Sequence, residues 1–279
     1  MPIPLSTPGI HNAFRVTGRI FSGSQPEGEA AFAELERLGV KTIVSVDGAK
    51  PDVLAARKYG LRYIHLPIGY DGLSPRRILE LIRASTEQPG AIYVHCHHGK
   101  HRGPAAVAMM CQATAGWSPE RAEQWLRQAG TAEEYAGLYR ATREFQPVTK
   151  EQLARVGELP EVAETPALVD LMVAIDERFD SLKTAQKAGW RTSSNWTHLT
   201  PAHEATVLWE HFREFARIEE TGKRPDNYRT RLADSEKAIH ALRVGLTQTP
   251  LDFPSLEAAM KQITQSCTAC HKTYRNERK

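Results

Sequence analysis

The amino-acid sequence has little of several features that mark particular protein classes. Its 279 residues include only four cysteines, 8% aromatic residues and a net charge of +3. It contains no low-complexity tract and no repeat of the period that solenoid proteins show. Lysine and arginine alternate with glutamate and aspartate, so we expect no nucleic-acid partner. These absences leave a globular protein with no membrane span and no need for structural disulfides.

The first half of the chain alternates between predicted strands and predicted helices. We expect strands at 14–21, 42–46, 61–66 and 91–94, and helices at 27–38, 51–59, 75–85, 104–115, 119–128 and 131–145. This order predicts an α/β fold, a central and mostly parallel sheet with helices on both faces. We place this domain at residues 1–146.

The second half contains four amphipathic helical patterns, which glycines and prolines separate. They cover residues 166–188, 201–221, 226–246 and 255–276. Four such helices with short connections predict an all-α antiparallel four-helix bundle at residues 165–279. The proline-containing segment between the two domains, residues 147–164, is predicted to be a linker.

Cys96 and Arg102 bracket five residues directly after an apolar run, Ala91-Ile92-Tyr93-Val94. The loop runs into a predicted helix, whose positive end and backbone N–H groups favour an anion at one site. The same field favours the thiolate of Cys96, which is the reactive form of cysteine. Arg102 offers a planar fork of donors for two phosphoryl oxygens. We predict a phosphate-binding loop of His97, His98, Gly99, Lys100, His101 and Arg102.

The sequence from His95 through Cys96 to Arg102 resembles the signature of the cysteine-dependent protein tyrosine phosphatases, in particular their small dual-specificity branch. The resemblance covers residues 14–146. It implies hydrolysis of a phosphorylated protein or a small phosphomonoester through a phosphocysteine at Cys96, with Arg102 binding the phosphate and His95 supporting the loop. Gly103 stands where this family usually has Ser or Thr, whose hydroxyl helps the thiolate leave, so we expect slow hydrolysis of the phosphoenzyme.

The resemblance also requires an aspartic acid that protonates the leaving group from a separate loop. We predict Asp71 for this role, because it lies between two glycines, Gly69 and Gly72, in a loop that can move over a bound phosphate. Asp47, at the end of another predicted strand, is the alternative.

The loop carries an unusual number of histidines, His97, His98 and His101. Near neutral pH they can be partly charged and add positive potential at the anion site, which is the interpretation we favour. Binding of a metal ion by these histidines is the alternative.

Cys267-Thr-Ala-Cys270-His271 has the spacing of a c-type haem attachment motif. On one helical turn the two thiols can add to the porphyrin vinyl groups, while His271 presents a ring nitrogen to the iron. A redox dithiol and half of a zinc site are the alternatives, although the sequence has no second pair of closely spaced cysteines and no predicted strand before the motif.

The same motif with Tyr274 and Arg275 resembles the C-terminal helix of the cytochrome c′ and cytochrome c-556 family, over residues 163–279. The resemblance implies a haem c, with Cys267 and Cys270 as attachment points and His271 as the axial iron ligand. Met172 aligns with the methionine that ligates iron in six-coordinate members, or it fills the core. Ligation by Met172 suits electron transfer with a redox partner, and an open site suits a diatomic gas.

The two signatures bear on compartment. The haem resemblance implies attachment outside the cytoplasm, but the chain begins Met1-Pro-Ile-Pro without the charged and apolar regions of an export signal. We expect a periplasmic or otherwise exported protein whose signal has been removed, or a cytoplasmic one if the haem assignment is wrong. The expected function is phosphatase activity fused to a haem domain for electron transfer or redox or gas sensing. The alternative is a haem protein whose first domain only binds phosphorylated or anionic ligands.

Overall fold

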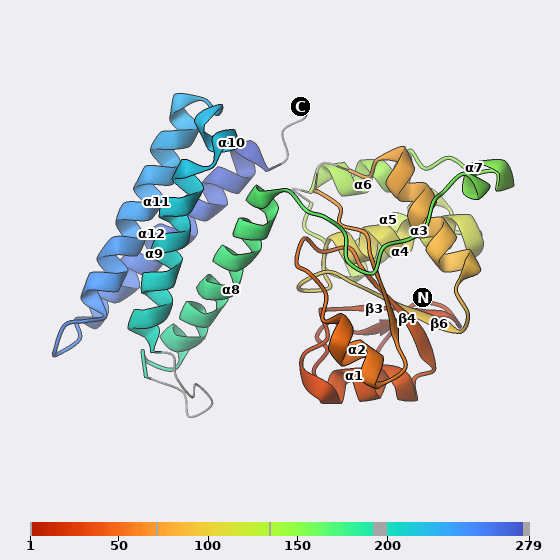
Figure 1. The fold of residues 1–279 in the computed structure, drawn as a ribbon, viewed down its shortest axis with the longest axis horizontal. Coiled ribbons are helices and arrows are strands. Elements are labelled where there is room, and N and C mark those ends of the chain that lie inside the picture. The colour runs from red at the N-terminus through yellow and green to blue at the C-terminus, as the bar shows by residue number, and fades with distance from the viewer. Residues whose placement is uncertain (1, 71, 134, 192–199, 276–279) are drawn as a thin grey trace. The chain divides into compact units, whose positions relative to one another are not determined.

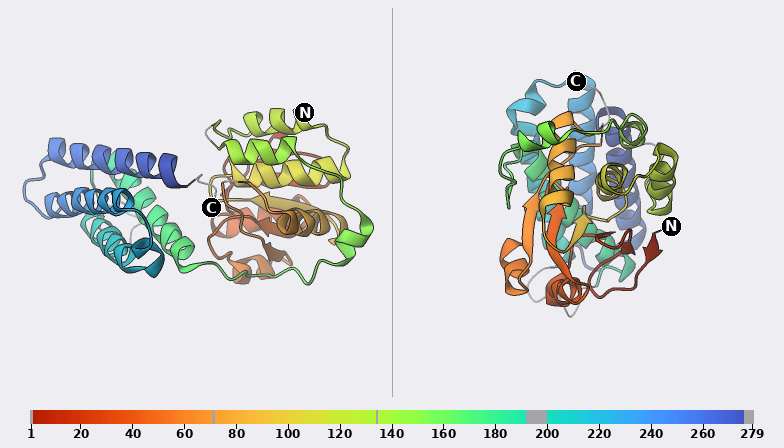
Figure 2. Two further views of the ribbon diagram at one scale, coloured as in Figure 1. Left: turned by 90° about the horizontal axis from the view of Figure 1, so that it is seen from above. Right: turned by 90° about the vertical axis from the view of Figure 1, so that its right-hand side faces the viewer.

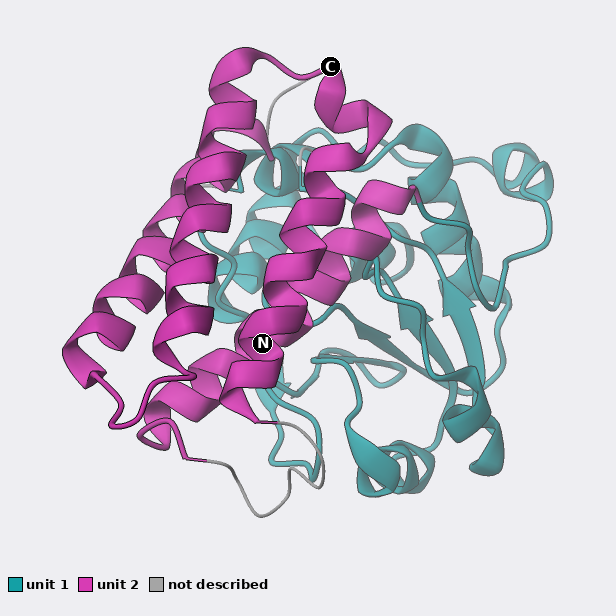
Figure 3. Cartoon of the chain, turned by 60° about the vertical axis from the view of Figure 1, so that its left-hand side comes forward, with its two compact units in different colours: residues 1–165, 276–279 teal, residues 166–275 magenta. Residues whose placement is uncertain are grey.

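The computed structural model describes residues 2–70, 72–133, 135–191 and 200–275. The chain divides into two compact units, residues 1–165 and residues 166–275 (Figure 3). None of the described helices is long and apolar enough to cross a lipid bilayer.

Unit 1 is built on a six-stranded sheet of order β1-β2-β3-β6-β4-β5 (Figure 1). Strands β3, β6, β4 and β5 are parallel to their neighbours, whereas β1 and β2 join the β3 edge in antiparallel pairings. The sheet is therefore mixed, with a parallel centre, and the strand predicted at 14–21 is divided into the antiparallel pair β2–β3. The strands are β1 Ile3–Pro4, β2 Phe14–Arg15, β3 Ile20–Gly23, β4 Val40–Ser45, β5 Arg62–His65 and β6 Ala91–His95.

Helices cover both faces of this sheet, as predicted, and each face has its own core (Figures 1 and 2). Alternate side chains along a strand enter different cores, so that Ile43 packs with α1 and α2 while its neighbour Val44 packs with α3 to α6. The helices are α1 Gly28–Arg37, α2 Val53–Lys58, α3 Pro75–Glu87, α4 Arg102–Thr114, α5 Pro119–Gln128 and α6 Ala136–Arg143.

The strand register brings the functional loops to one edge of the sheet. His95 of β6 is paired with both Gly23 of β3 and Ser45 of β4, and Ser45 is paired with His65 of β5. The carboxyl ends of four parallel strands therefore lie at one level, where active sites gather in sheets of this kind.

The segment predicted as a linker, residues 147–164, packs on unit 1 instead of running free. It contains the short helix α7, Lys150–Ala154, whose first turn Thr149 and Gln152 stabilise as a capping box. Leu159 is only 6% exposed and belongs to the core formed with α3 to α6. The prediction of a linker depended on proline content. Proline content does not distinguish a flexible segment from an extended segment that buries a leucine.

The described residues of unit 2 form four long helices and one short helix. They are α8 Ala167–Lys187, α9 Pro201–Arg217, α10 Glu219–Gly222, α11 Asp226–Gly245 and α12 Phe253–Tyr274. The consecutive pairs α8–α9, α9–α11 and α11–α12 pack along their lengths. Thr200 and Asp252 cap α9 and α12 through side-chain hydrogen bonds, and Pro201 occupies the first turn of α9.

Candidate active site

Cys96 lies in the turn that connects β6 to α4, and its side chain is only 3% exposed. The first turn of α4 packs directly on it. A β-carbon on Gly103, the second residue of α4, would lie 3.3 Å from the Cys96 backbone nitrogen and 3.6 Å from its Sγ. The sulfur therefore lies at the N-terminal end of a 13-residue helix, where the helix dipole favours negative charge.

Three carbonyl groups of the loop after Cys96 accept hydrogen bonds from residues outside the loop. The backbone N–H of Gln25 donates to the carbonyl oxygen of His97 at 3.0 Å. Asn12 Nδ2 donates to the carbonyl of Gly99 at 3.0 Å, and Thr131 Oγ1 donates to that of Lys100 at 2.6 Å.

Because C=O and N–H point in opposite directions across a trans peptide, the N–H groups that follow these three carbonyls face the interior of the loop. They belong to His98, Lys100 and His101. Inward N–H groups at the start of a helix form an anion-binding concavity.

Asp47 comes from the neighbouring strand end and holds the loop from inside the molecule. Its Oδ2 accepts a hydrogen bond from the backbone N–H of His97 at 2.7 Å and one from Nη2 of Arg102 at 2.5 Å. Burial opposes its ionisation, but the Arg102 charge and the N–H groups of Ala49 and His97 outweigh it, so the pKa of Asp47 is lowered. Asp47 therefore carries no proton near neutral pH, which argues against it as the alternative general acid.

Asp71, the predicted general acid, lies outside the described residues. Its neighbour Tyr70 is described, and the guanidinium carbon of Arg102 lies 4.7 Å from the centroid of the Tyr70 ring. The Tyr70 and Tyr135 ring centroids are 4.7 Å apart, and those of Tyr135 and His101 are 4.5 Å apart. Three segments thus place an aromatic wall beside Arg102, and a described residue of the predicted acid loop contacts the arginine that is predicted to bind phosphate.

His95 is buried beneath the loop, with Nε2 3.3 Å from the hydroxyl oxygen of Tyr63. Burial lowers the pKa of His95 to about 4, so the imidazole is neutral at pH 7. Its support of the loop is consequently through packing and hydrogen bonding and not through a positive charge near the thiolate.

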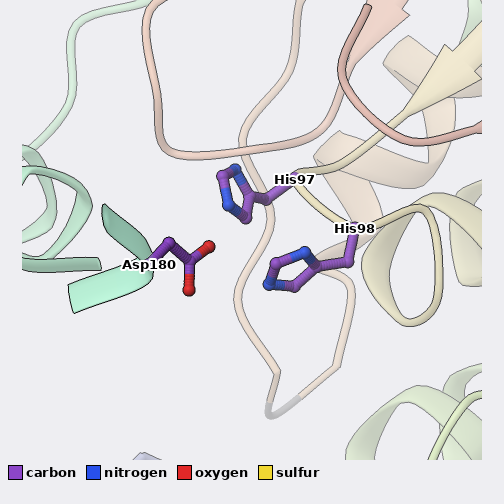
Figure 4. A group of neighbouring side chains, drawn as sticks. All are labelled: His97, His98 and Asp180. Atoms are coloured by element: carbon purple, nitrogen blue, oxygen red, sulfur yellow. The ribbon is translucent and has the colours of Figure 1, made fainter. Parts of the chain in front are cut away.

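His97 and His98 are neighbours on the same turn, with ring centroids 4.2 Å apart (Figure 4). His98 is exposed and His97 half-buried, whereas His101 packs on Tyr135. The histidines therefore border the loop on two sides. The side chain of Lys100 is exposed and runs beside Gly130 on the outer side of the loop, so Lys100 contributes its backbone N–H.

The family model for the Swiss Army Knife protein DSP-PTPase phosphatase domain, PTP-SAK, matches residues 13–156, just over half of the chain. The chain belongs to this family. The match lies within unit 1 and does not bear on unit 2.

The name of two curated relatives agrees with the family assignment. The dual specificity protein phosphatase TpbA of two Pseudomonas aeruginosa strains is 28% identical over 126 residues, which are 44% of this chain and 56% of TpbA. The chain thus spans about half the length of the curated relatives it matches. A crystal structure of P. aeruginosa TpbA is similar with a TM-score of 0.46 and 23% identity, covering 52% of this chain and 90% of that chain.

The second predicted site lies on α12 of unit 2. Cys267 and Cys270 are free thiols, both half-buried, and pack on the apolar core of unit 2, against which Met172 of α8 also packs. Burial raises the pKa of Cys267 to about 11 and also raises that of Cys270. His271 follows on the exposed side of the helix.

Asn12 and Thr131 carried no signal in the sequence for their bonds to the phosphate loop, and Asp47 was predicted only as the alternative general acid. Asn12, Asp47 and Thr131 lie far from Cys96 in the chain, and each acts through one hydrogen bond or two to the loop. Asn12 adopts a φ of 51°, a conformation that asparagine tolerates better than most residues, and this is the only local hint of a special role.

Proposed function

We propose that unit 1 hydrolyses phosphomonoesters through a covalent phosphocysteine. The observation that carries this proposal is the loop itself, in which Cys96 meets the first turn of α4 while the loop carbonyls are bonded on the outside. The family assignment and the name of the curated relatives support the same reaction.

In the first step the Cys96 thiolate attacks phosphorus, the bond to the leaving oxygen breaks, and that oxygen takes a proton from Asp71. Arg102 and the inward N–H groups hold the phosphoryl oxygens, whose charge they stabilise during transfer. In the second step water attacks phosphorus, its proton goes to the Asp71 carboxylate, and the thiolate of Cys96 leaves. The substrate is a phosphorylated protein or a small phosphomonoester.

Turnover of p-nitrophenyl phosphate by wild type, Cys96→Ser and Cys111→Ala tests this proposal. Cys111 is the matched control, because burial raises its pKa to about 12 and the thiol is unreactive. We expect Cys96→Ser to abolish turnover and Cys111→Ala to retain it. Equal rates for wild type and Cys96→Ser would favour the alternative function, in which unit 1 only binds phosphorylated or anionic ligands.

We also propose that unit 2 carries a haem c. Cys267 and Cys270 would form the thioether bonds and His271 would ligate the iron, and the bound group would supply one-electron or gas-binding chemistry. The phenolic oxygen of Tyr274 supports the fit, because it is buried without a hydrogen-bond partner among the described residues. Arg224 and Arg231 place positive charge near Cys270, which suits an anionic propionate.

The arrangement of the long helices also suits such a group. The first and last, α8 and α12, pack together much less closely than the consecutive pairs do. They are joined at one end by Glu257, which accepts a hydrogen bond from Trp190 Nε1 at 3.3 Å. A flat group inserted between α8 and α12 would therefore disrupt less helix–helix packing than one inserted between consecutive helices.

The absorption spectrum of protein from a haem-maturing host tests the haem proposal. We expect a covalent c-type spectrum that Cys267→Ala with Cys270→Ala removes. A low-spin spectrum that becomes high-spin in Met172→Ala would identify Met172 as the sixth ligand, and an unchanged spectrum would leave it as core. A protein that stays colourless would refute the haem proposal and, with it, the proposed export to the periplasm and the proposed redox partner or diatomic gas.

A further inference from the structure

The side chain of Asp47 faces the phosphate loop, and both of its carboxylate oxygens accept hydrogen bonds from other groups of the protein. Oδ1 accepts from the backbone N–H of Ala49 at 3.0 Å. Oδ2 accepts from the His97 N–H and from Nη2 of Arg102. The carboxylate is 3% exposed, so water competes little for these bonds.

Arg102 is held on two different sides as a result. Asp47 accepts a hydrogen bond from Nη2 of the guanidinium, and the guanidinium carbon lies over the Tyr70 ring, 4.7 Å from its centroid. A hydrogen bond and a ring contact from two different residues together restrict movement of the planar group. The orientation of the fork that receives phosphate is thus set before a ligand arrives.

Asp47 is in turn fixed from behind by His65. Nδ1 of His65 accepts a hydrogen bond from the backbone N–H of Ala163, so the ring proton is on Nε2, which donates to the Asp47 carbonyl oxygen at 2.9 Å. The backbone N–H of His65 also donates to the carbonyl of Pro160 at 2.8 Å. The segment 159–163 therefore braces the strand end that carries Asp47.

The charges explain why a carboxylate suits this position. A guanidinium that is mostly buried is costly to leave unpaired, so Arg102 needs a counter-ion when no phosphate is present. Asp47 supplies this negative charge through its hydrogen bond with Nη2 of Arg102.

We propose that Asp47 is a positioning residue, which orients the Arg102 guanidinium for phosphate binding and anchors the start of the loop by accepting the His97 N–H. The proposal rests on the proposed phosphatase function of the same loop. It assigns Asp47 no contact with substrate and no proton transfer.

The substitution Asp47→Asn tests it, since asparagine keeps an acceptor for the His97 N–H but loses the charge that holds Arg102. Asp52→Asn is the matched control. Asp52 is exposed and caps α2 by accepting from the Ala55 N–H, which asparagine does equally well. Both variants are compared with wild type in the full chain, and circular dichroism verifies that they fold.

Three measurements are made on each protein. We expect Asp47→Asn to weaken calorimetric binding of inorganic phosphate, and to lower kcat/KM for p-nitrophenyl phosphate, by roughly a hundredfold, the scale on which small misplacements of a catalytic group act. We expect alkylation of Cys96 by neutral iodoacetamide not to slow, because that reaction needs no arginine fork. Asp52→Asn should match wild type in all three.

The outcomes separate this inference from the proposed function. Wild-type phosphate affinity in Asp47→Asn would overturn the inference, and so would a parallel slowing of Cys96 alkylation, which would indicate general disruption of the loop. A wild-type protein that binds phosphate without turnover would refute the phosphatase proposal, while the phosphate affinity of Asp47→Asn still decides the inference. A wild-type protein that neither binds inorganic phosphate nor hydrolyses p-nitrophenyl phosphate would refute both the inference and the phosphatase proposal.

Discussion

The backbone N–H of Ala163 donates a hydrogen bond to Nδ1 of His65 at 3.1 Å, which fastens the end of unit 1 to strand β5. Leu159, four residues earlier, is buried in the core formed with α3 to α6. These contacts make the segment before unit 2 a structural part of unit 1.

Replacing Leu159 tests this conclusion about the segment. We expect Leu159→Ala to lower the free energy of unfolding of unit 1 by about 2–4 kcal/mol, as for other buried leucines. Val162→Ala is the matched control, because Val162 is 45% exposed and should change stability by less than about 0.5 kcal/mol. Urea unfolding followed by circular dichroism measures both, and equal stability of the two variants would show that the segment is a linker after all.

Because Gly103 has no hydroxyl group, we predict slow breakdown of the phosphoenzyme. A β-carbon at this position would lie 3.6 Å from Cys96 Sγ, so the hydroxyl of Gly103→Ser would come within hydrogen-bonding reach of the leaving thiolate. Such a bond to a charged group contributes about 1.5–3 kcal/mol, which corresponds to a rate gain of roughly tenfold or more.

Pre-steady-state kinetics with p-nitrophenyl phosphate measures this effect. Wild type should release a burst of p-nitrophenol equal to the enzyme concentration, and Gly103→Ser should show a faster steady state with a smaller burst. Gly103→Ala adds the same β-carbon without the hydroxyl and should behave as wild type. A similar acceleration in Gly103→Ala would exclude the hydroxyl as the cause.

Gly99 is required for the shape of the phosphate loop. Its φ is +68°, and a β-carbon there would lie 2.3 Å from the Gly23 carbonyl carbon and 2.5 Å from the Ser24 nitrogen, both backbone atoms. We expect Gly99→Ala to cost about 2–4 kcal/mol, the sum of backbone strain and overpacking, and to abolish turnover.

Gly116 provides the control for that substitution. It has a similar φ of +62°, but no atom lies within 4 Å of its added β-carbon. Gly116→Ala should therefore show only the backbone strain, about 1 kcal/mol, with turnover unchanged. Thermal or urea unfolding of the two variants separates the terms, and equal losses would contradict the close approach of the loop to the end of β3.

From the lowered pKa of His95 we predict that acid destabilises unit 1. Burial lowers its pKa from 6.5 to about 4, so between these values the unfolded chain takes up a proton that the folded protein does not. The contribution of His95 to stability is therefore complete above pH 6.5 and is lost as the pH falls, by about 2 kcal/mol between pH 7 and pH 5.

The measurement is urea unfolding of wild type and His95→Gln at both pH values. The lowered pKa of Asp47 acts in the same direction, but it is lost only in stronger acid, when the carboxyl itself is protonated. His95→Gln should be less stable overall and should lack this part of the dependence. If the variant retained the full dependence on pH, His95 would not be its source.

Local sequence was sufficient for most of the helices and strands and for the strand, turn and helix around Cys96. The turn from β6 through Cys96 to α4 depends on residues adjacent in the chain, and the long helices of unit 2 follow from their hydrophobic period and their glycine and proline breaks. The helix predicted at 131–145 starts later, at Ala136, because Thr131 instead bonds the Lys100 carbonyl. Such a contact between distant segments has no local signature.

The role of Asp47 was out of reach for the same reason. An aspartate after a strand is compatible with an acid, a turn or a counter-ion, and only the pairing of β4 with β6 decides among them. Burial of Leu159 was likewise not predictable, since one leucine among prolines and glutamates gives no periodic pattern.

The pairing of β4 with β6 has a consequence for the tolerance of unit 1 to length changes. The insertion of a single residue in β4 would shift its pairing with β6 by one residue and displace Asp47, which follows the strand, from its position beside Arg102. Arg102 would then lose its anchor although no atom of its own loop had been altered. Insertions or deletions in β4 are thus expected to abolish the reaction at Cys96 and Arg102, although the loop that carries these residues lies about fifty residues further along the chain.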